Sequence, residues 1–217
     1  MEDKSNKHIF SIIFLPLLFV IIIWCVKIIE YVFNFSLIHF GVLAKELSGI
    51  KGIIFYPFIH NDWNHLLNNT FPVFILLIML FVFYRKIAIQ IFSYLFLISG
   101  VLLWLIGRPD SYHIGASGII FGLASFLITS GIVRKNPKLS SISLLVIFLY
   151  GSLIWGIFPF KINMSWEGHL SGFLTGILLA VFYRKKGPKR KKYSWEEEEE
   201  IVEEVNNSSI NLLQRHN

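Results

Sequence analysis

Four polar side chains that stand in otherwise apolar sequence could together carry out acyl transfer: His65, Asn69, Ser117 and His169. A serine hydroxyl becomes a nucleophile when a neighbouring base removes its proton, and an imidazole, whose pKa in water is about 6.5, is such a base at neutral pH. Side-chain N–H groups can stabilise the oxyanion that forms when the hydroxyl attacks a carbonyl group. These four residues are therefore the first candidates for a catalytic site.

His65 and Asn69 are four residues apart, so they lie on one face of a helix. Both can donate side-chain hydrogen bonds toward one point. The alternative is that they join neighbouring helices, as polar groups in bilayers often do. The pair by itself leaves both interpretations open.

Ser117 lies in the sequence Gly115-Ala116-Ser117-Gly118 at the start of an apolar segment. Small neighbours leave its hydroxyl accessible, and a helix N-terminus provides free N–H groups and a partial positive charge, which suit an oxyanion. The alternative is a packing seam, because Gly118 and Gly122 form a pair of small residues four apart. Taken alone, this motif favours the seam.

His169, Gly172 and Gly176 recur at helical spacing and share one face. Glycines on that face would let the helix backbone approach a partner closely, and the segment that follows Ser117 carries matching glycines. We therefore expect the two segments to pack together, with His169 within hydrogen-bond reach of Ser117. Without these glycines, a histidine at the membrane surface would be the simpler interpretation.

Six apolar segments are long enough to cross a membrane, which takes about 20 mostly apolar residues. The chain has 217 residues, of which 54% are hydrophobic and 16% charged, whereas soluble domains carry about 25% charged residues. This composition excludes an ordinary soluble globule and an intrinsically disordered chain. The sequence predicts an all-α polytopic membrane protein with spans at 9–29, 64–84, 87–106, 115–133, 140–158 and 167–183.

The positions of lysine and arginine predict the orientation of these spans. Most basic residues lie before the first span and in the connections after the second, fourth and sixth, so we expect both termini to be cytoplasmic. The connections 30–63, 107–114 and 159–166 then face outward. The three polar segments, which contain His65, Ser117 and His169, therefore begin spans at the same face of the membrane.

The chain divides into a cytoplasmic N-terminus (1–8), a six-helix domain (9–184) and a charged cytoplasmic tail (185–217). The net charge of +6 is interpreted as membrane orientation, because the basic residues stand in short blocks between apolar runs and do not form the basic face of a nucleic-acid binder. The basic part of the tail could contact anionic lipid, although a solvated anchor is the simpler interpretation. The sequence predicts no cofactor and no metal site.

Three motifs, in this order and on these spans, resemble those of the rhomboid intramembrane serine proteases. They are His65-x-x-x-Asn69, the Gly-x-Ser-Gly sequence around Ser117, and Gly168-His169 followed by Gly172 and Gly176. The resemblance covers spans two to six, and it implies a six-transmembrane-helix rhomboid-like bundle. Inactive rhomboid-like relatives lack the serine or the histidine, and this chain has both.

The resemblance also implies a role for each site residue. Ser117 looks like the nucleophile and His169 like the general base. His65, Asn69 and the Ser117 backbone N–H look like the donors of the oxyanion hole. Phe121 falls where the family has an aromatic ring that packs on the histidine. The Trp-Arg pair that the family often has after the first span is absent from this sequence.

The mechanism expected from these residues is a Ser–His dyad, since the only acidic residue in spans two to six is Glu167 at a loop end. Packing, by Phe121, would then orient the imidazole. The 107–114 connection has irregular, polar backbone, which is tolerated at membrane depth only beside protein or water, so we expect it to line a water-accessible cavity. Substrates would be transmembrane proteins whose spans have small, helix-breaking residues near their outer ends.

Three other functions fit parts of the same sequence. A polytopic transporter would place its polar groups near mid-span, whereas here they stand at helix starts. A metallo-hydrolase would use the four histidines 60, 65, 113 and 169, whose spacing is not that of a zinc protease motif. A non-catalytic rhomboid-like protein that binds transmembrane helices has no use for an intact dyad. The oligomeric state is left open.

Overall fold

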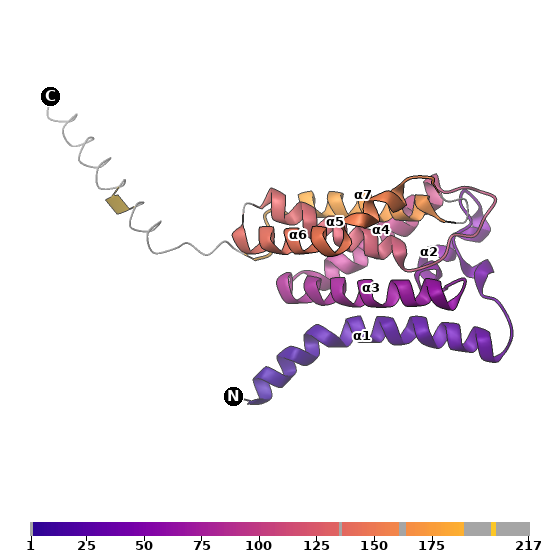
Figure 1. Cartoon of the computed structure of the whole chain (residues 1–217), viewed down its shortest axis with the longest axis horizontal. Helices are drawn as coiled ribbons and strands as arrows, with labels where there is room; N and C mark the ends of the chain where they lie inside the picture. The colour runs from indigo at the N-terminus through magenta and orange to yellow at the C-terminus, as the bar shows by residue number, and fades with distance from the viewer. Residues whose placement is uncertain (1, 135, 161–163, 189–200, 203–217) are drawn as a thin grey trace, which may run out of the picture.

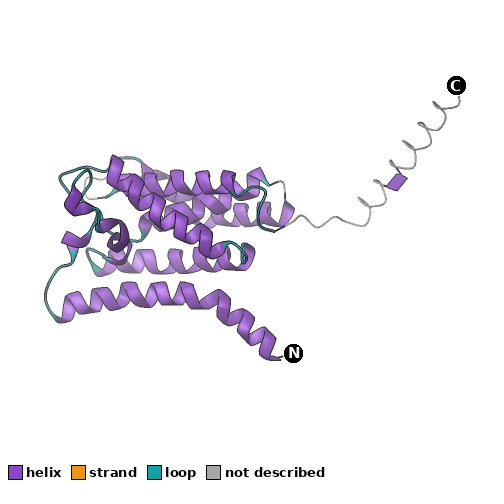
Figure 2. Cartoon of the chain, turned by 180° about the vertical axis from the view of Figure 1, so that it is seen from behind, coloured by secondary structure: helices purple, strands orange, loops and turns teal. Residues whose placement is uncertain are grey.

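The computed structural model describes residues 2–134, 136–160, 164–188 and 201–202. Within them the chain is helical and contains no strand, as Figure 2 shows, apart from one isolated bridge between Val42 and His113. Most of the predicted tail at 185–217 lies outside the described residues. The α-helices are α1 (Glu2–Val32), α2 (Gly52–Phe55), α3 (Trp63–Phe83), α4 (Ala88–Ile106), α5 (Ser117–Val133), α6 (Pro137–Tyr150) and α7 (Trp166–Phe182). Short 3-10 helices are η1 (Ile38–Phe40), η2 (Leu47–Gly49), η3 (Tyr56–Phe58) and η4 (Gly151–Ile157).

Four of the six expected spans are confirmed as helices long and apolar enough to cross a membrane. They are Ile12–Val32, Trp63–Phe83, Ala88–Ile106 and Pro137–Ile157, the last combining α6 with η4. The first begins three residues later than the sequence predicts, inside a helix that already starts at Glu2. The other two expected spans are α5 and α7, apolar helices of 17 residues each, which at 1.5 Å per residue are about 26 Å long. The count of six spans therefore stays a prediction.

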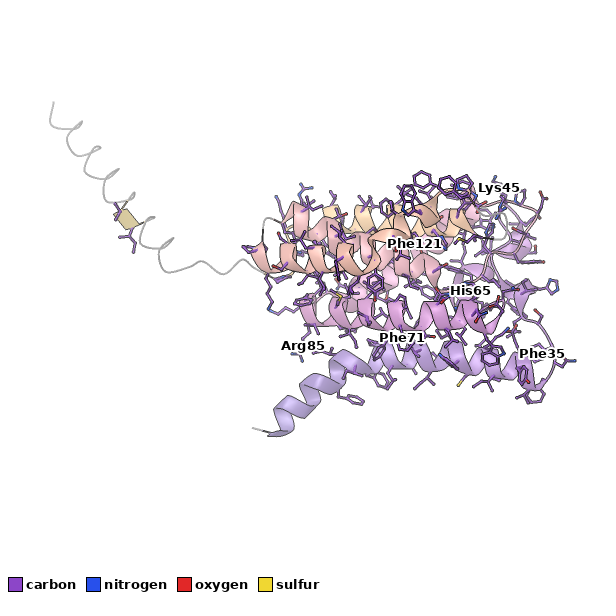
Figure 3. The ribbon with its side chains drawn as sticks, viewed as in Figure 1. Phe35, Lys45, His65, Phe71, Arg85 and Phe121 are labelled. Carbon is purple, nitrogen blue, oxygen red and sulfur yellow. The ribbon has the colours of Figure 1, made fainter. Side chains whose placement is uncertain are left out.

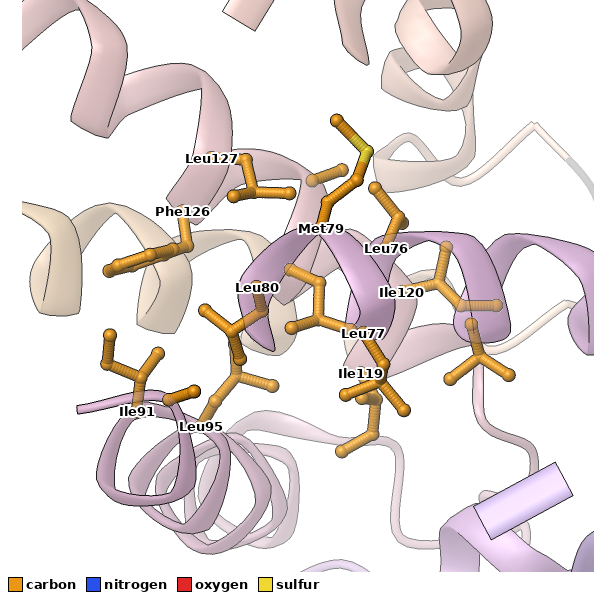
Figure 4. Packing of buried hydrophobic residues seen from close by; sticks show 14 of the residues in the cluster. Leu76, Leu77, Met79, Leu80, Ile91, Leu95, Ile119, Ile120, Phe126 and Leu127 are labelled. Atoms are coloured by element: carbon orange, nitrogen blue, oxygen red, sulfur yellow. The ribbon is translucent and has the colours of Figure 1, made fainter. Parts of the chain in front are cut away.

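Helix α5 forms the centre of the bundle and packs against α3, α4, α6 and α7. Its side chains are mostly apolar on every face and mostly buried, which is typical of a helix enclosed by others. Figure 4 shows side chains of α3, α4 and α5 meeting in the core; they include Leu76, Leu80, Ile91, Leu95, Ile119 and Phe126. Large apolar side chains such as Phe71 and Phe148 are exposed on the outside of the bundle, as suits a surface that faces lipid.

The first turns of α3, α5 and α7 lie at one end of the bundle, opposite the end at which α1 begins and α7 ends (Figure 1). In Figure 3, His65 lies toward the end that also carries Phe35 and Lys45, whereas Arg85 lies at the other end. The three polar segments thus share one end of the bundle, and their common position at one face of a membrane stays a prediction. The long connection before α3, with its short helices, covers this end.

Candidate active site

Ser117 and His169 are in direct contact. Ser117 is the first residue of α5, and His169 lies in the first turn of α7. The Nε2 atom of His169 is 2.9 Å from the Oγ atom of Ser117, which is hydrogen-bond distance. The imidazole is buried and the serine half-buried. The contact that the sequence predicts between these two side chains is therefore present.

The main-chain carbonyl of Gly156 determines which imidazole nitrogen carries the proton. The Nδ1 atom of His169 lies 2.8 Å from the Gly156 oxygen, and a carbonyl oxygen can only accept a hydrogen bond. Nδ1–H of the neutral imidazole therefore donates to Gly156, which leaves the Nε2 lone pair facing the Ser117 hydroxyl. This is the tautomer that a general base needs.

The ring of Phe121 lies flat on the imidazole, with ring centroids 4.2 Å apart and planes 5° from parallel. The prediction that Phe121 packs on His169 is confirmed. A Cβ atom at Gly156 would lie 2.7 Å from the Phe121 ring and 3.1 Å from Nδ1, so only glycine fits beside this stack. The sequence analysis missed Gly156, because a main-chain carbonyl has no side chain by which a pattern could identify it.

Glycines bring the helices of the two residues together, as predicted. A Cβ atom at Gly172 would collide with the carbonyl oxygen of Gly118, and one at Gly176 would collide with the carbonyl oxygen of Gly122. The Ser125 hydroxyl adds a hydrogen bond of 2.9 Å to the main chain of α7. Close backbone packing at small residues is the usual way in which helices associate in bilayers.

The close contact of α5 and α7 at these glycines, which we call the glycine seam, makes a substitution at Gly172 costly. In Gly172→Ala the added methyl meets the main chain of α5, which cannot move aside, so α5 and α7 must separate near the dyad. A displacement of about 1 Å at a catalytic contact can lower a reaction rate by about 10²-fold. We expect Gly172→Ala to lower the rate of a reaction that uses the dyad by at least that factor. The control is Gly151→Ala, whose Cβ would be 3.6 Å from Ile147 and in ordinary contact. Equal rates in the two variants, for a reaction that uses the dyad, would contradict the role of these glycines in positioning it.

The connection before α3 holds the segment that leads into Ser117. Val42 and His113 exchange two main-chain hydrogen bonds of 3.0 and 2.8 Å, and the Gly115 N–H donates to the Tyr56 carbonyl at 2.8 Å. Gly115 has φ +107°, a conformation that favours glycine, and a Cβ atom there would lie 2.6 Å from the His65 ring. The Gly115 of the motif thus allows both the turn and the packing of His65.

His60 supports the same turn from its buried position. Its Nε2 atom accepts a hydrogen bond of 3.4 Å from the Ala116 N–H, and its ring centroid is 5.0 Å from that of His65. Burial, followed by the nearby His65, lowers the pKa of His60 to about 3. The ring is therefore neutral at physiological pH and available as an acceptor beside Ser117.

The two predicted oxyanion donors occupy different surroundings. His65 lines the same cavity as Ser117 and His169. Asn69 is buried, and its Nδ2 atom donates to the His65 carbonyl at 2.9 Å, one turn earlier in α3. The oxyanion role of both residues stays a prediction.

A cavity of 730 Å³ contains the dyad. The prediction that the 107–114 connection lines it is confirmed, since five of its residues do so. The lining residues are Ile38, Asn61, Asp62, Asn64, His65, Asn68, Arg108, Ser111, Tyr112, His113, Ile114, Ser117, Met164, Ser165 and His169. In the part of the chain that the structure describes, no three histidine, cysteine or acidic side chains form a group that could hold a metal ion.

Comparison with known proteins identifies the family. The model of the rhomboid domain matches residues 48–186, from the connection before α3 to the end of α7. The chain belongs to the rhomboid family. Together with its apolar helices of membrane length, this makes it an integral membrane protein. The rhomboid domain is that of a family of intramembrane proteases that act on transmembrane substrates within the bilayer.

Two relatives from different organisms are similar to this chain over most of its length. A protein of Mycobacterium tuberculosis, named only as uncharacterized, is 34% identical over 184 residues, which cover 81% of this chain and 75% of the relative. A protein of Acanthamoeba polyphaga mimivirus, whose name describes it as a rhomboid protein, is 28% identical over 167 residues, covering 74% of this chain and 89% of the relative.

Proposed function

We propose that this rhomboid protein is a serine endopeptidase that cleaves transmembrane segments of membrane proteins near the extracytoplasmic face. The observation that carries the proposal is the contact between Ser117 Oγ and His169 Nε2, with Nδ1 of the same ring bonded to the Gly156 carbonyl. A hydroxyl paired with a correctly protonated base, inside a polar cavity, is the arrangement that nucleophilic acyl transfer requires.

The reaction follows from these groups. The Ser117 oxygen attacks the carbonyl carbon of the substrate peptide bond, and its proton passes to Nε2 of His169. The imidazolium then donates that proton to the leaving amine, and the first product departs while the other remains as an ester on Ser117. A water molecule, deprotonated by His169, hydrolyses the ester and restores the serine. The Gly156 carbonyl and the Phe121 ring keep the imidazole in place in the absence of a third, acidic residue.

The oxyanion of the intermediate would lie at the start of α5. The Ser117 N–H belongs to the first turn of that helix, where N–H groups have no partner within the helix and the dipole is positive. The side chains of His65 and Asn69 are the further donors in this proposal. Hydrogen bonds of this kind act on the charge that develops during the reaction.

Loss of Asn69 should slow the reaction moderately. In Asn69→Ala we expect kcat to fall about 10–100-fold with little change in KM, because one oxyanion donor among several is removed. Kinetics on a fluorogenic transmembrane peptide measure both constants. The control is Gln90→Ala, which removes an exposed side-chain amide near the start of α4, outside the cavity. A change confined to KM would contradict an oxyanion role for Asn69.

The proposal places six helices across the membrane, with α5 and α7 as the two short spans. It places both termini and residues 1–8 and 185–217 in the cytoplasm, with residues 9–184 as the transmembrane domain of a bacterial plasma membrane protein. The cavity of 730 Å³ then opens to the extracytoplasmic side and admits the water that hydrolysis needs. A substrate helix must unwind locally to expose its carbonyls, which favours substrates with small, helix-breaking residues there.

Cleavage of a defined substrate tests the proposal. The purified protein is reconstituted with a single-span protein that carries glycine and alanine near its outer end, and the products are identified by mass spectrometry. We expect one cut within the span, insensitivity to EDTA and inhibition by a fluorophosphonate. Binding of the substrate without any cut would support the non-catalytic alternative instead.

A further inference from the structure

Four side chains outside the dyad join the connection before α5 to the start of α7: Arg108, His113, Ser165 and Glu167. We call them the outer clamp. The Nδ1 atom of His113 lies 2.7 Å from Ser165 Oγ. The Nε atom of Arg108 lies 2.6 Å from Glu167 Oε1, and its Nη2 atom donates to the Met164 carbonyl at 3.1 Å. The connection before α5 is thus held to the residues at the start of α7 at three points.

The protons of the outer clamp can be assigned from its acceptors. His113 Nε2 lies 3.1 Å from the Arg108 carbonyl, so Nε2–H is the donor and Nδ1 accepts from the Ser165 hydroxyl. Ser165 is the N-cap of α7, and its oxygen accepts from the Gly168 N–H at 3.4 Å. Burial lowers the pKa of His113, which favours the neutral ring that this arrangement uses. One hydroxyl therefore caps the helix and binds the opposite connection.

The spacing of the clamp matches that of the dyad. His113 precedes Ser117 by four residues, and Ser165 precedes His169 by four. The two contacts, His113 with Ser165 and Ser117 with His169, each join residues 52 apart. The outer clamp lies on one side of the dyad and the glycine seam on the other, so the position of α7 against α5 is fixed on both sides of the reacting atoms.

The ion pair between Arg108 and Glu167 raises the free-energy cost of moving α7 away from its position against α5. The Glu167 side chain is only 1% exposed, whereas that of Arg108 is 41% exposed. A buried carboxylate that loses its cationic partner carries a large desolvation penalty. Because Glu167 is in the first turn of α7, two residues before His169, any shift of this turn away from Arg108 would incur that penalty.

We infer that the outer clamp positions His169 against Ser117, so that Arg108, His113, Ser165 and Glu167 are positioning residues for the proposed reaction. The inference rests on the proposed function for its kinetic consequences. The residues act through the dyad contact: they hold the first turn of α7 and the segment before α5 in register. Three of them also line the cavity, so their effect must be separated from substrate binding.

Substitutions at Ser165 and Glu167 test the inference kinetically. Ser165→Ala removes the hydroxyl, and Glu167→Gln removes the charge at nearly constant shape. We expect kcat to fall about tenfold or more in both with KM unchanged, because a small displacement of the base is enough. The control is Ser165→Thr, which keeps the hydroxyl and should restore the rate. All rates are taken at one temperature well below the unfolding temperature of each variant. A lower unfolding temperature with unchanged kcat, or a change in KM alone, would overturn the inference.

A spectroscopic measurement separates this inference from the proposed function. NMR of the ¹⁵N-histidine-labelled protein in detergent reports the tautomer of His169 whether or not the protein cleaves a substrate. We expect the Nδ1–H form in the native protein and in Ser165→Thr, and a mixture of forms in Ser165→Ala and, if it folds, in Glu167→Gln. Identical His169 signals in Ser165→Ala and Ser165→Thr would overturn the inference. Altered signals in a protein without peptidase activity would support the positioning role and refute the protease.

Discussion

Ser117→Ala is expected to abolish cleavage of a reconstituted transmembrane substrate, with a fall in kcat of about 10⁴-fold or more. The substitution removes the oxygen that attacks the peptide bond and leaves the helix start and the cavity unchanged. The unfolding temperature should therefore remain close to that of the native protein, and the substrate should still bind. Turnover is measured by following the cleaved fragment over time.

The matched control for this variant is Ser141→Ala, which removes an exposed serine near the start of α6, outside the cavity. Its turnover should equal that of the native protein. If Ser117→Ala cleaved the substrate at a similar rate, the nucleophile would have to be another group, and the serine mechanism would be excluded.

His169→Ala should be nearly as inactive, with kcat lower by about 10³-fold or more, because without a base the hydroxyl keeps its proton. Residues that act as a unit have non-additive effects, so the double variant with Ser117→Ala should be no slower than Ser117→Ala alone. The rates of both single variants and the double variant are measured on the same substrate.

The control for the histidine is His39→Ala, which removes an exposed imidazole that does not line the cavity. We expect this variant to retain the native rate. A double variant that is slower than Ser117→Ala by a further large factor would contradict a shared step for Ser117 and His169.

The sequence predicts the parts of the site that depend on side-chain spacing. Glycines at Gly172 and Gly176 indicate a close helix contact because only a missing Cβ permits it, and the collisions with α5 that a Cβ would cause there bear this out. Phe121 follows Ser117 by one helical turn and does stack on His169. Periodicity places each of these residues on a particular face of its own helix, and the family resemblance supplied the partner of Phe121.

Other parts of the site depend on contacts that no local pattern contains. The Gly156 carbonyl is a main-chain group in a 3-10 turn that follows α6, and its use as an acceptor depends on where that turn lies in space. Arg108 stands in the connection before α5 and Glu167 in the first turn of α7, and neither residue alone indicates its partner. These contacts could be found only from the assembled bundle.

The number of membrane spans could not be settled by hydropathy. Hydropathy measures how apolar a segment is, and α5 is apolar along its whole length, yet it has only 17 residues because Gly115 and Ala116 form the turn before it. Helices α5 and α7 are therefore both shorter than the 18 residues taken here for a span, and both begin at the end of the bundle that carries the dyad.

Chemical labelling of Ser117 tests the central claim most directly. The detergent-solubilised protein is treated with a fluorophosphonate, which reacts with a serine oxygen only when a base activates it, and the modified residue is identified by peptide mass spectrometry. The account predicts one modified serine, Ser117, in the native protein and no modification in His169→Ala. An unmodified Ser117 in folded native protein, or equal labelling of Ser117 with and without His169, would contradict it.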